Sequence, residues 1–126
     1  MSNKTSRIVF TSDYTQVVCC DEPGQGNACH QYQIESRPTN TNGIIHNINL
    51  TSVSFQNGPI QENGVNGCQN EDLISIVIDR LKGFQSGKFA CEENATALSK
   101  LEEALSSLQS RTNKRKARGV EGKNVI

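Results

Sequence analysis

The spacing of the apolar residues changes once along this chain, close to Gly67. Before Gly67, short β-favouring segments are separated by turn residues, so the chain has room only for strands of about 4–7 residues. After Gly67, apolar side chains recur at every third or fourth position, which is the period of an amphipathic helix. The change predicts an α+β fold. In it, a small N-terminal antiparallel β-sheet precedes a C-terminal antiparallel two-helix hairpin, within a single domain of residues 1–126.

The sheet part is predicted over residues 7–56. Its segments are rich in β-branched and aromatic residues or alternate in polarity, as half-buried strands do. Polar clusters at residues 21–27, 37–43 and 57–59 are typical of turns between antiparallel strands. The strands are predicted at residues 7–10, 14–20, 28–35, 44–50 and 52–56.

The first helix is predicted to begin with Asn70 as its N-cap and to end near Gly87. Acidic residues in its first turn suit the positive end of the helix dipole. Its apolar face consists of Leu73, Ile74, Val77, Ile78, Leu81 and Phe84.

The second helix is predicted to begin at Glu92 and to end at Gly119. The connection at residues 84–89 is short enough to force an antiparallel hairpin over residues 66–119, followed by a tail at residues 120–126. A packing seam runs along this helix and continues to polar positions; its members are Leu98, Leu101, Leu105, Leu108, Thr112 and Arg115.

Composition limits the classes of partner. Thirteen basic and thirteen acidic residues give a net charge of zero, which argues against a nucleic acid polymer or an anionic membrane as the main partner. Six basic residues against one acidic residue nevertheless gather within residues 111–126. No stretch approaches the roughly 20 apolar residues that span a bilayer. Only 34% of the residues are hydrophobic and there is no Trp, so the core is small and partner subunits are expected to complete it.

Catalytic and metal-binding motifs are not recognisable in the sequence. It has no phosphate-binding glycine loop, no nucleophile elbow and no zinc-protease motif, and two histidines leave little supply for a general base and its partner. Cys19, Cys20, Cys29 and His30 have the right chemistry for zinc but lack the C-x-x-C spacing. We therefore predict no enzyme activity, no cofactor and no metal. The odd number of cysteines, with no apolar leader before them, indicates reduced thiols in a cytoplasmic protein.

The basic end of the second helix is the strongest candidate for a binding site. Arg111, Arg115 and Arg118 are spaced to share one side of the helix, and guanidinium groups bind phosphate in a bidentate way. Phe84 could stack on a base and Asn94 could contact a base edge, so the set would suit a small nucleotide. The alternative interpretation is structural: a solubilising helix end, a core phenylalanine and a residue at a helix start. The pattern alone leaves the two open.

Several motifs in the second half of the chain resemble a known family. These are GCQNEDLI at residues 67–74, FQSGKFACEEN at 84–94, LEEAL at 101–105, RT at 111–112 and RGVEG at 118–122. They are similar to the helical hairpin shared by two families of phage anti-defence sponges, one directed against Thoeris immunity and the other against CBASS. A preceding sheet, here residues 7–56, resembles the first type of Thoeris anti-defence protein.

The resemblance implies binding without catalysis. Members of the family sequester a cyclic ADP-ribose isomer, the glyco-cyclic signal made by TIR-domain enzymes, in the cytoplasm of the bacterial host. They are homo-oligomers, commonly hexamers, with pockets where hairpins of neighbouring protomers meet, and some bind cyclic trinucleotides at a second site. By resemblance Phe84 is the base-stacking ring, Asn94 the base-contacting amide, Arg111 and Arg115 the pyrophosphate-binding residues, and Arg118 a residue at the pocket edge.

Other functions remain as alternatives. A small phage DNA-binding regulator would use the basic helix, although the neutral net charge and the absence of a recognisable helix-turn-helix count against it. A hydrolase of the signal would need a nucleophile and a base, which the sequence does not offer in a recognisable arrangement. A structural assembly protein would have no use for the row of arginines.

Overall fold

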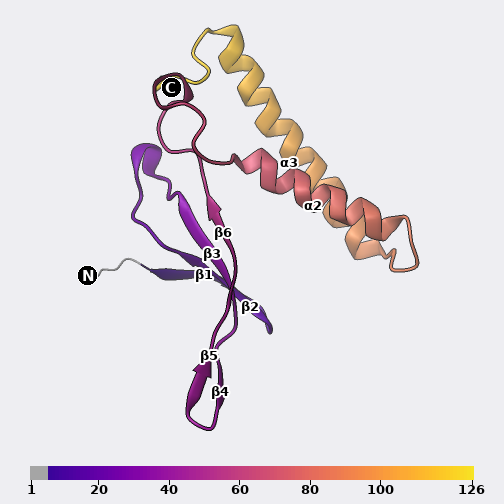
Figure 1. Ribbon diagram of the computed structural model, residues 1–126. Helices are drawn as coiled ribbons and strands as arrows, with labels where there is room; N and C mark the ends of the chain where they lie inside the picture. Colours follow the sequence, from indigo (N-terminus) through magenta and orange to yellow (C-terminus); the bar gives the residue numbers. More distant parts are fainter. Residues whose placement is uncertain (1–5) are drawn as a thin grey trace. The chain divides into compact units, whose positions relative to one another are not determined.

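The computed structural model describes residues 6–126 (Figure 1). Residues 1–5 of the predicted domain lie outside the described residues. The chain divides into two compact units, Met1–Gly58 and Pro59–Ile126, and each is described by itself. An antiparallel sheet in the first unit precedes helices in the second, which confirms the predicted α+β fold.

The first unit is built on a four-stranded sheet in the order β1-β2-β3-β6. Every neighbouring pair of strands is antiparallel. The connection between β2 and β3 contains a short 3-10 helix, η1 (Gln25–Asn27). The four strands are β1 (Arg7–Thr11), β2 (Thr15–Cys19), β3 (Gln31–Ser36) and β6 (Asn49–Ser54).

A separate two-stranded ribbon corrects two predictions. Residues 37–43 were predicted as a turn and 44–50 as one strand, but β4 (Thr39–Thr41) pairs with β5 (Ile44–His46). Asn42 and Gly43 both have positive φ, of 54° and 81°. This conformation closes a two-residue hairpin, so the turn shrinks to those residues and the chain after β5 starts a new strand.

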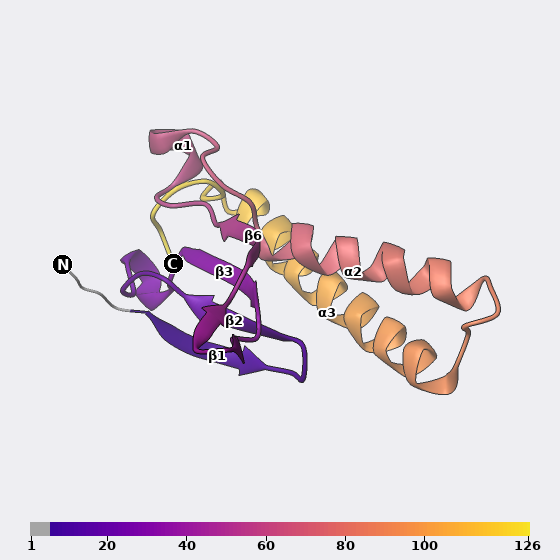
Figure 2. The same ribbon diagram turned by 60° about the horizontal axis from the view of Figure 1, so that its bottom comes forward.

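The second unit contains α1 (Ile60–Asn63), α2 (Asn70–Gln85) and α3 (Glu92–Ala117). The short helix α1 was not predicted. α2 and α3 pack as an antiparallel hairpin (Figure 2). The prediction of Asn70 as N-cap is wrong by one residue: Gln69 precedes the helix, and its main-chain N–H donates to the Asp72 carboxylate at 2.8 Å. No described helix is long and apolar enough to cross a membrane.

The predicted seam of α3 is confirmed: its six positions are buried or partly buried, whereas most other positions of the helix are exposed. On α2 only Ile78 is buried. Val77, which was predicted on the same face, is 43% exposed, and neighbouring Ile76 is 63% exposed. The correction has a simple cause: one helix shields only a narrow stripe of another, so the wider apolar face of α2 stays open.

α3 ends in a Schellman motif. The N–H of Val120 donates to the carbonyl of Arg115, and the N–H of Gly119 donates to that of Lys116, each at 3.0 Å. Gly119 has a φ of +75°, which glycine adopts without strain. The motif turns the C-terminal tail, residues 120–126, back toward the last turns of α3.

Candidate ligand-binding site

Arg115 lies where the C-terminal tail folds back on α3. Its side chain is largely buried, with its Nε 3.1 Å from Glu121 Oε1. The two terminal nitrogens donate to main-chain oxygens of Val120 at 2.9 Å and of Lys123 at 3.0 Å, and also to those of Val125 and Ile126. The guanidinium is therefore saturated by its own chain, and it fixes the tail.

The other two predicted arginines are exposed on either side of Arg115. Arg118 Nη1 donates to the main-chain oxygen of Ile126 at 2.9 Å, whereas Arg111 makes no side-chain hydrogen bond or ion pair within residues 6–126. A groove of about 310 Å³ lies here, between the end of α3 and the tail. We call it the basic groove; it is lined by Ser107, Ser110, Arg111, Lys114, Arg115, Arg118 and Ile126.

The chemistry of the basic groove suits a phosphorylated ligand. Arg111, Lys114 and Arg118 offer cationic donors that no carboxylate within the described range neutralises. The serine hydroxyls can donate to further phosphate oxygens. Its volume lies near the lower end of small-molecule sites, which are about 300–1,000 Å³. The groove is therefore large enough for the charged part of a compact nucleotide.

Phe84 and Asn94 lie at the opposite end of the hairpin, beside the turn at residues 86–91. The guanidinium of Arg80 lies 5.1 Å from the centre of the Phe84 ring, which is 36% exposed. Such a cation covers one face of an aromatic ring. Asn94 is partly exposed, and its main-chain N–H donates at 3.5 Å to the Sγ of Cys91, the N-cap of α3.

The hairpin turn is held in place by the side chain of Gln85. Its Nε2 donates to the carbonyl of Cys91 at 3.1 Å, and its Oε1 accepts from the N–H of the same residue at 3.0 Å. This pair of bonds joins the last residue of α2 to the residue before α3. Phe84 and the start of α3 consequently belong to one rigid corner.

The structure does not bring the two groups of predicted residues together within one chain. Arg111 lies 17 positions after Asn94 in the continuous helix α3. At a rise of about 1.5 Å per residue this corresponds to about 25 Å, which a compact cyclic nucleotide cannot bridge. The predicted binding residues therefore form two separate groups on one chain, which we call the turn half-site, Phe84 and Asn94, and the arginine half-site, the arginines of the basic groove.

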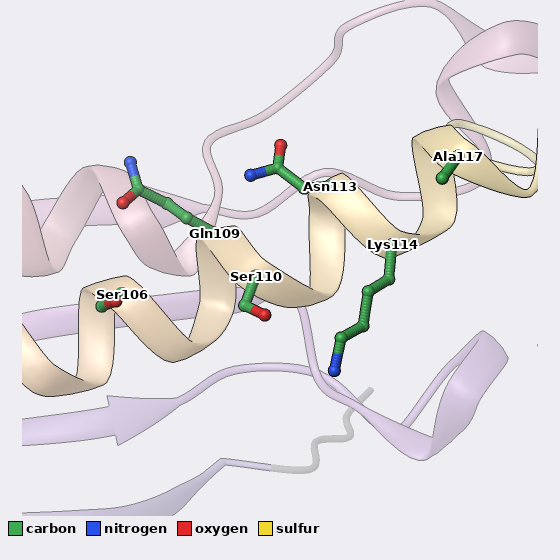
Figure 3. Close-up of a pocket in the computed structure, with 6 residues that line it drawn as sticks. All are labelled: Ser106, Gln109, Ser110, Asn113, Lys114 and Ala117. Atoms are coloured by element: carbon green, nitrogen blue, oxygen red, sulfur yellow. The ribbon is translucent and has the colours of Figure 1, made fainter.

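A polar strip runs along α3 beside the basic groove (Figure 3). Gln109 and Asn113 point to one side of the helix in this view, and Lys114 points to the other. The strip encloses a shallow volume of about 450 Å³ and consists of Ser106, Gln109, Ser110, Asn113, Lys114 and Ala117. It shares Ser110 and Lys114 with the basic groove, so it extends that surface.

Sequence reasoning missed several residues in or beside these half-sites. Ser107 and Lys114 share the helical face of Arg111 and Arg118, with steps of four, three and four that could have revealed them. Arg80 lies four residues before Phe84, the spacing of a helical neighbour. Phe89, in the turn, is 68% exposed and is a second available ring; no periodic signal marked it.

A second cluster of reactive groups lies in the sheet unit. Cys20, one member of the rejected metal set, points away from the others, with its Sγ 3.7 Å from the carbonyl of Val18. Burial raises the pKa of the Cys20 thiol. Cys19 and Cys29 instead converge, together with Asp21, which the sequence analysis had not included.

Comparison with known proteins adds to this geometry. Residues 50–112, half of the chain, match the family described as "Acb2/Tad1, hairpin domain". The match contains Phe84, Asn94 and Arg111 and ends before Arg115. A protein of Bacillus phage SBSphiJ7 named "Thoeris anti-defense 1" is 58% identical to this chain over 73 residues, which are 58% of this chain and 51% of that protein. The chain thus spans about half the length of the relative that it matches.

Proposed function

The chain belongs to the Acb2/Tad1 hairpin family, and on that premise we propose that it is a phage anti-defence protein that sequesters a nucleotide signal of Thoeris immunity. The ligand is a cyclic ADP-ribose isomer of the glyco-cyclic kind made by TIR-domain enzymes. The protein binds it in the cytoplasm of the bacterial host and does not degrade it. No cofactor takes part in this function.

The observation that carries the proposal is the basic groove in a chain of zero net charge. A pyrophosphate carries two negative charges, and Arg111 and Arg118 can each offer two parallel N–H donors to it. Local rather than overall positive charge favours a compact dianion over a long polyanion, whose binding draws on many phosphate contacts.

In this proposal the two half-sites of one pocket come from different protomers of a homo-oligomer. Because they lie about 25 Å apart on one rigid helix, a ligand that contacts both must lie between the turn of one protomer and the basic groove of another. Exposed Ile76 and Val77 on α2 supply apolar surface for such an assembly. We propose a hexamer, in which Phe84 stacks on the base, Asn94 contacts its edge and the arginines hold the pyrophosphate.

Arg115 has a different role in ligand binding from Arg111. It lines the same groove, but its donors are occupied by the tail and by Glu121. A pyrophosphate oxygen reaches it only where that oxygen replaces a main-chain oxygen of the tail. Arg115 therefore contributes to binding in two ways, by holding the tail that bounds the groove and by sharing its charge with the ligand.

The test is native mass spectrometry of the full chain with cyclic ADP-ribose isomers, cyclic trinucleotides and duplex DNA. The proposal expects an oligomer that retains an isomer with nanomolar affinity, about −12 kcal/mol, and releases it intact on heating. Recovery of a hydrolysed product would indicate an enzyme. Absence of binding to every isomer would contradict the proposal.

The same experiment separates two further possibilities. Cyclic trinucleotides that bind without displacing the ADP-ribose isomer would place a CBASS signal at a second site. A small DNA-binding regulator is the competing function, because Arg111, Lys114 and Lys116 are exposed on α3. That function predicts affinity for duplex DNA that falls steeply with salt concentration.

A further inference from the structure

Two thiols and a carboxylate converge at the connection between β2 and β3. Cys19 Sγ, Cys29 Sγ and a carboxylate oxygen of Asp21 all lie within 4.8 Å of one another. Cys19 is the last residue of β2, and the loop folds back through η1 so that Cys29 arrives just before β3. The loop, and not a short sequence spacing, brings the donors together.

The carboxylate of Asp21 is fixed by the backbone. The N–H of His30 donates to Oδ2 at 3.0 Å, and the N–H of Gln31 donates to Oδ1 at 3.2 Å. The buried imidazole of His30 has its Nδ1 3.8 Å from Oδ2. Carboxylates that bind metals are commonly held by such outer hydrogen-bonding partners, which set their orientation before the ion arrives.

The two thiols make only weak contacts. Cys19 is completely buried, and its Sγ lies 3.4 Å from the main-chain oxygen of Asp21. Cys29 Sγ lies 3.5 Å from the same oxygen. An S–H group is a weak donor, so these contacts are weak hydrogen bonds that a metal ion can replace. Arg7 Nη2, at 3.9 Å from Cys29 Sγ, offsets part of the negative charge that two thiolates would bring.

The sheet unit also has a need for stabilisation. It ends at Gly58, and Val18 and Cys19 are the buried hydrophobic residues of its described part. Domains of about 60 residues bury a smaller share of their unfolded-chain surface than larger domains do, so their stability is marginal and an added metal ion contributes a larger part of it. A bound ion contributes its binding free energy to folding, because the unfolded chain has no preformed site.

We propose that Cys19, Asp21 and Cys29 bind one thiophilic divalent metal ion, with Zn²⁺ as the ion of choice. The ligands are two thiolates and one carboxylate oxygen, and a water molecule takes the fourth tetrahedral position. Each thiol releases its proton to solvent as its sulfur binds, so nothing is oxidised or reduced. The site belongs to the sheet unit and is independent of the proposed function of the hairpin.

The experiment uses the reduced full-length protein after chelation, with Zn²⁺ and Co²⁺ as probes. We expect one ion per chain by native mass spectrometry, a tetrahedral Co²⁺ spectrum with a thiolate charge-transfer band, and a higher melting temperature with Zn²⁺. Cys29→Ser should lower the Zn²⁺ affinity by at least about tenfold. Cys20→Ser is the matched control, because Cys20 follows Cys19 directly but points away from the cluster. The Zn²⁺ affinity of this variant should equal that of the parent protein.

Three results would overturn the proposal: no ion retained by the reduced parent protein, equal Zn²⁺ affinity in Cys29→Ser, or loss of binding in Cys20→Ser alone. Cys29 is only partly buried, so its serine variant is expected to fold, which circular dichroism checks. Asp21→Asn provides a second variant. It keeps one acceptor for the backbone N–H groups and should weaken Zn²⁺ binding while the thiolate band remains.

Discussion

At the scale of single residues, Arg111 is the most direct test of the proposed pocket. Its guanidinium has no partner among the described residues, so its removal takes nothing from the folded protomer. A charge-assisted hydrogen bond contributes about 1.5–3 kcal/mol, so Arg111→Ala should weaken ligand binding by roughly 10- to 150-fold with an unchanged melting temperature. Calorimetry measures the affinity. Lys116→Ala, at an exposed basic position outside the basic groove, should leave it unchanged.

Arg115 should behave differently from Arg111, because it is already paired. Arg115→Ala leaves the Glu121 carboxylate and several tail oxygens without their donor. We expect a loss of about 2–4 kcal/mol in the free energy of unfolding together with weaker ligand binding. Denaturant unfolding measures the free energy of unfolding of Arg111→Ala and Arg115→Ala for comparison. Equal stability of Arg111→Ala and Arg115→Ala would contradict the role of Arg115 in holding the tail.

Phe84 is expected to account for most of the stacking on the base. Phe84→Ala should reduce ligand affinity by roughly 5- to 150-fold, since stacking on an aromatic ring contributes about 1–3 kcal/mol. Phe89→Ala is the comparison variant, because this more exposed ring lies in the turn that follows α2. If only the Phe89 variant loses binding by calorimetry, the base lies on the other ring.

At the scale of the elements, the end of α3 decides whether the basic groove exists. Gly119 has a positive φ, so Gly119→Ala should cost about 1–2 kcal/mol and loosen the Schellman motif. Gly119→Asn should cost less, because asparagine tolerates this conformation better. Amide hydrogen exchange of residues 120–126 reports the effect. Unchanged protection in Gly119→Ala would show that the tail is held by Arg115 alone.

Sequence periodicity predicted α2 and α3 well, because apolar residues recur at helical spacing along both, whereas the four-residue helix α1 is too short to show such a period. The α3 seam even placed Arg115 inward, after Leu108 and Thr112, which the structure confirms. The interpretation of Arg111, Arg115 and Arg118 as one row of arginines on the same side of the helix did not take that seam into account. The ribbon of β4 and β5 was missed because three-residue strands carry no measurable alternation, and the cysteine cluster was missed because loop geometry has no fixed spacing.

At the scale of the whole molecule, the separation of the half-sites predicts complementation between defective variants. Phe84→Ala retains its arginine half-site, and Arg111→Ala retains its turn half-site. When the two variants are unfolded together and refolded as a mixture, about a quarter of the pockets in random mixed oligomers should regain both halves. Ligand titration by calorimetry gives the number of sites. Two variants that stay inactive together would indicate a pocket built within one protomer.

The continuous helix between the two half-sites has a consequence for which changes the protein can accept. One residue inserted in the middle of α3 would move Arg111 only about 1.5 Å along the axis but would turn it by about 100° relative to Asn94. Substitutions on the polar strip of Figure 3 neither shift nor rotate one half-site relative to the other. The number of residues in α3 thus sets both the distance and the rotation between the two half-sites. The helix should therefore tolerate substitutions far better than insertions or deletions.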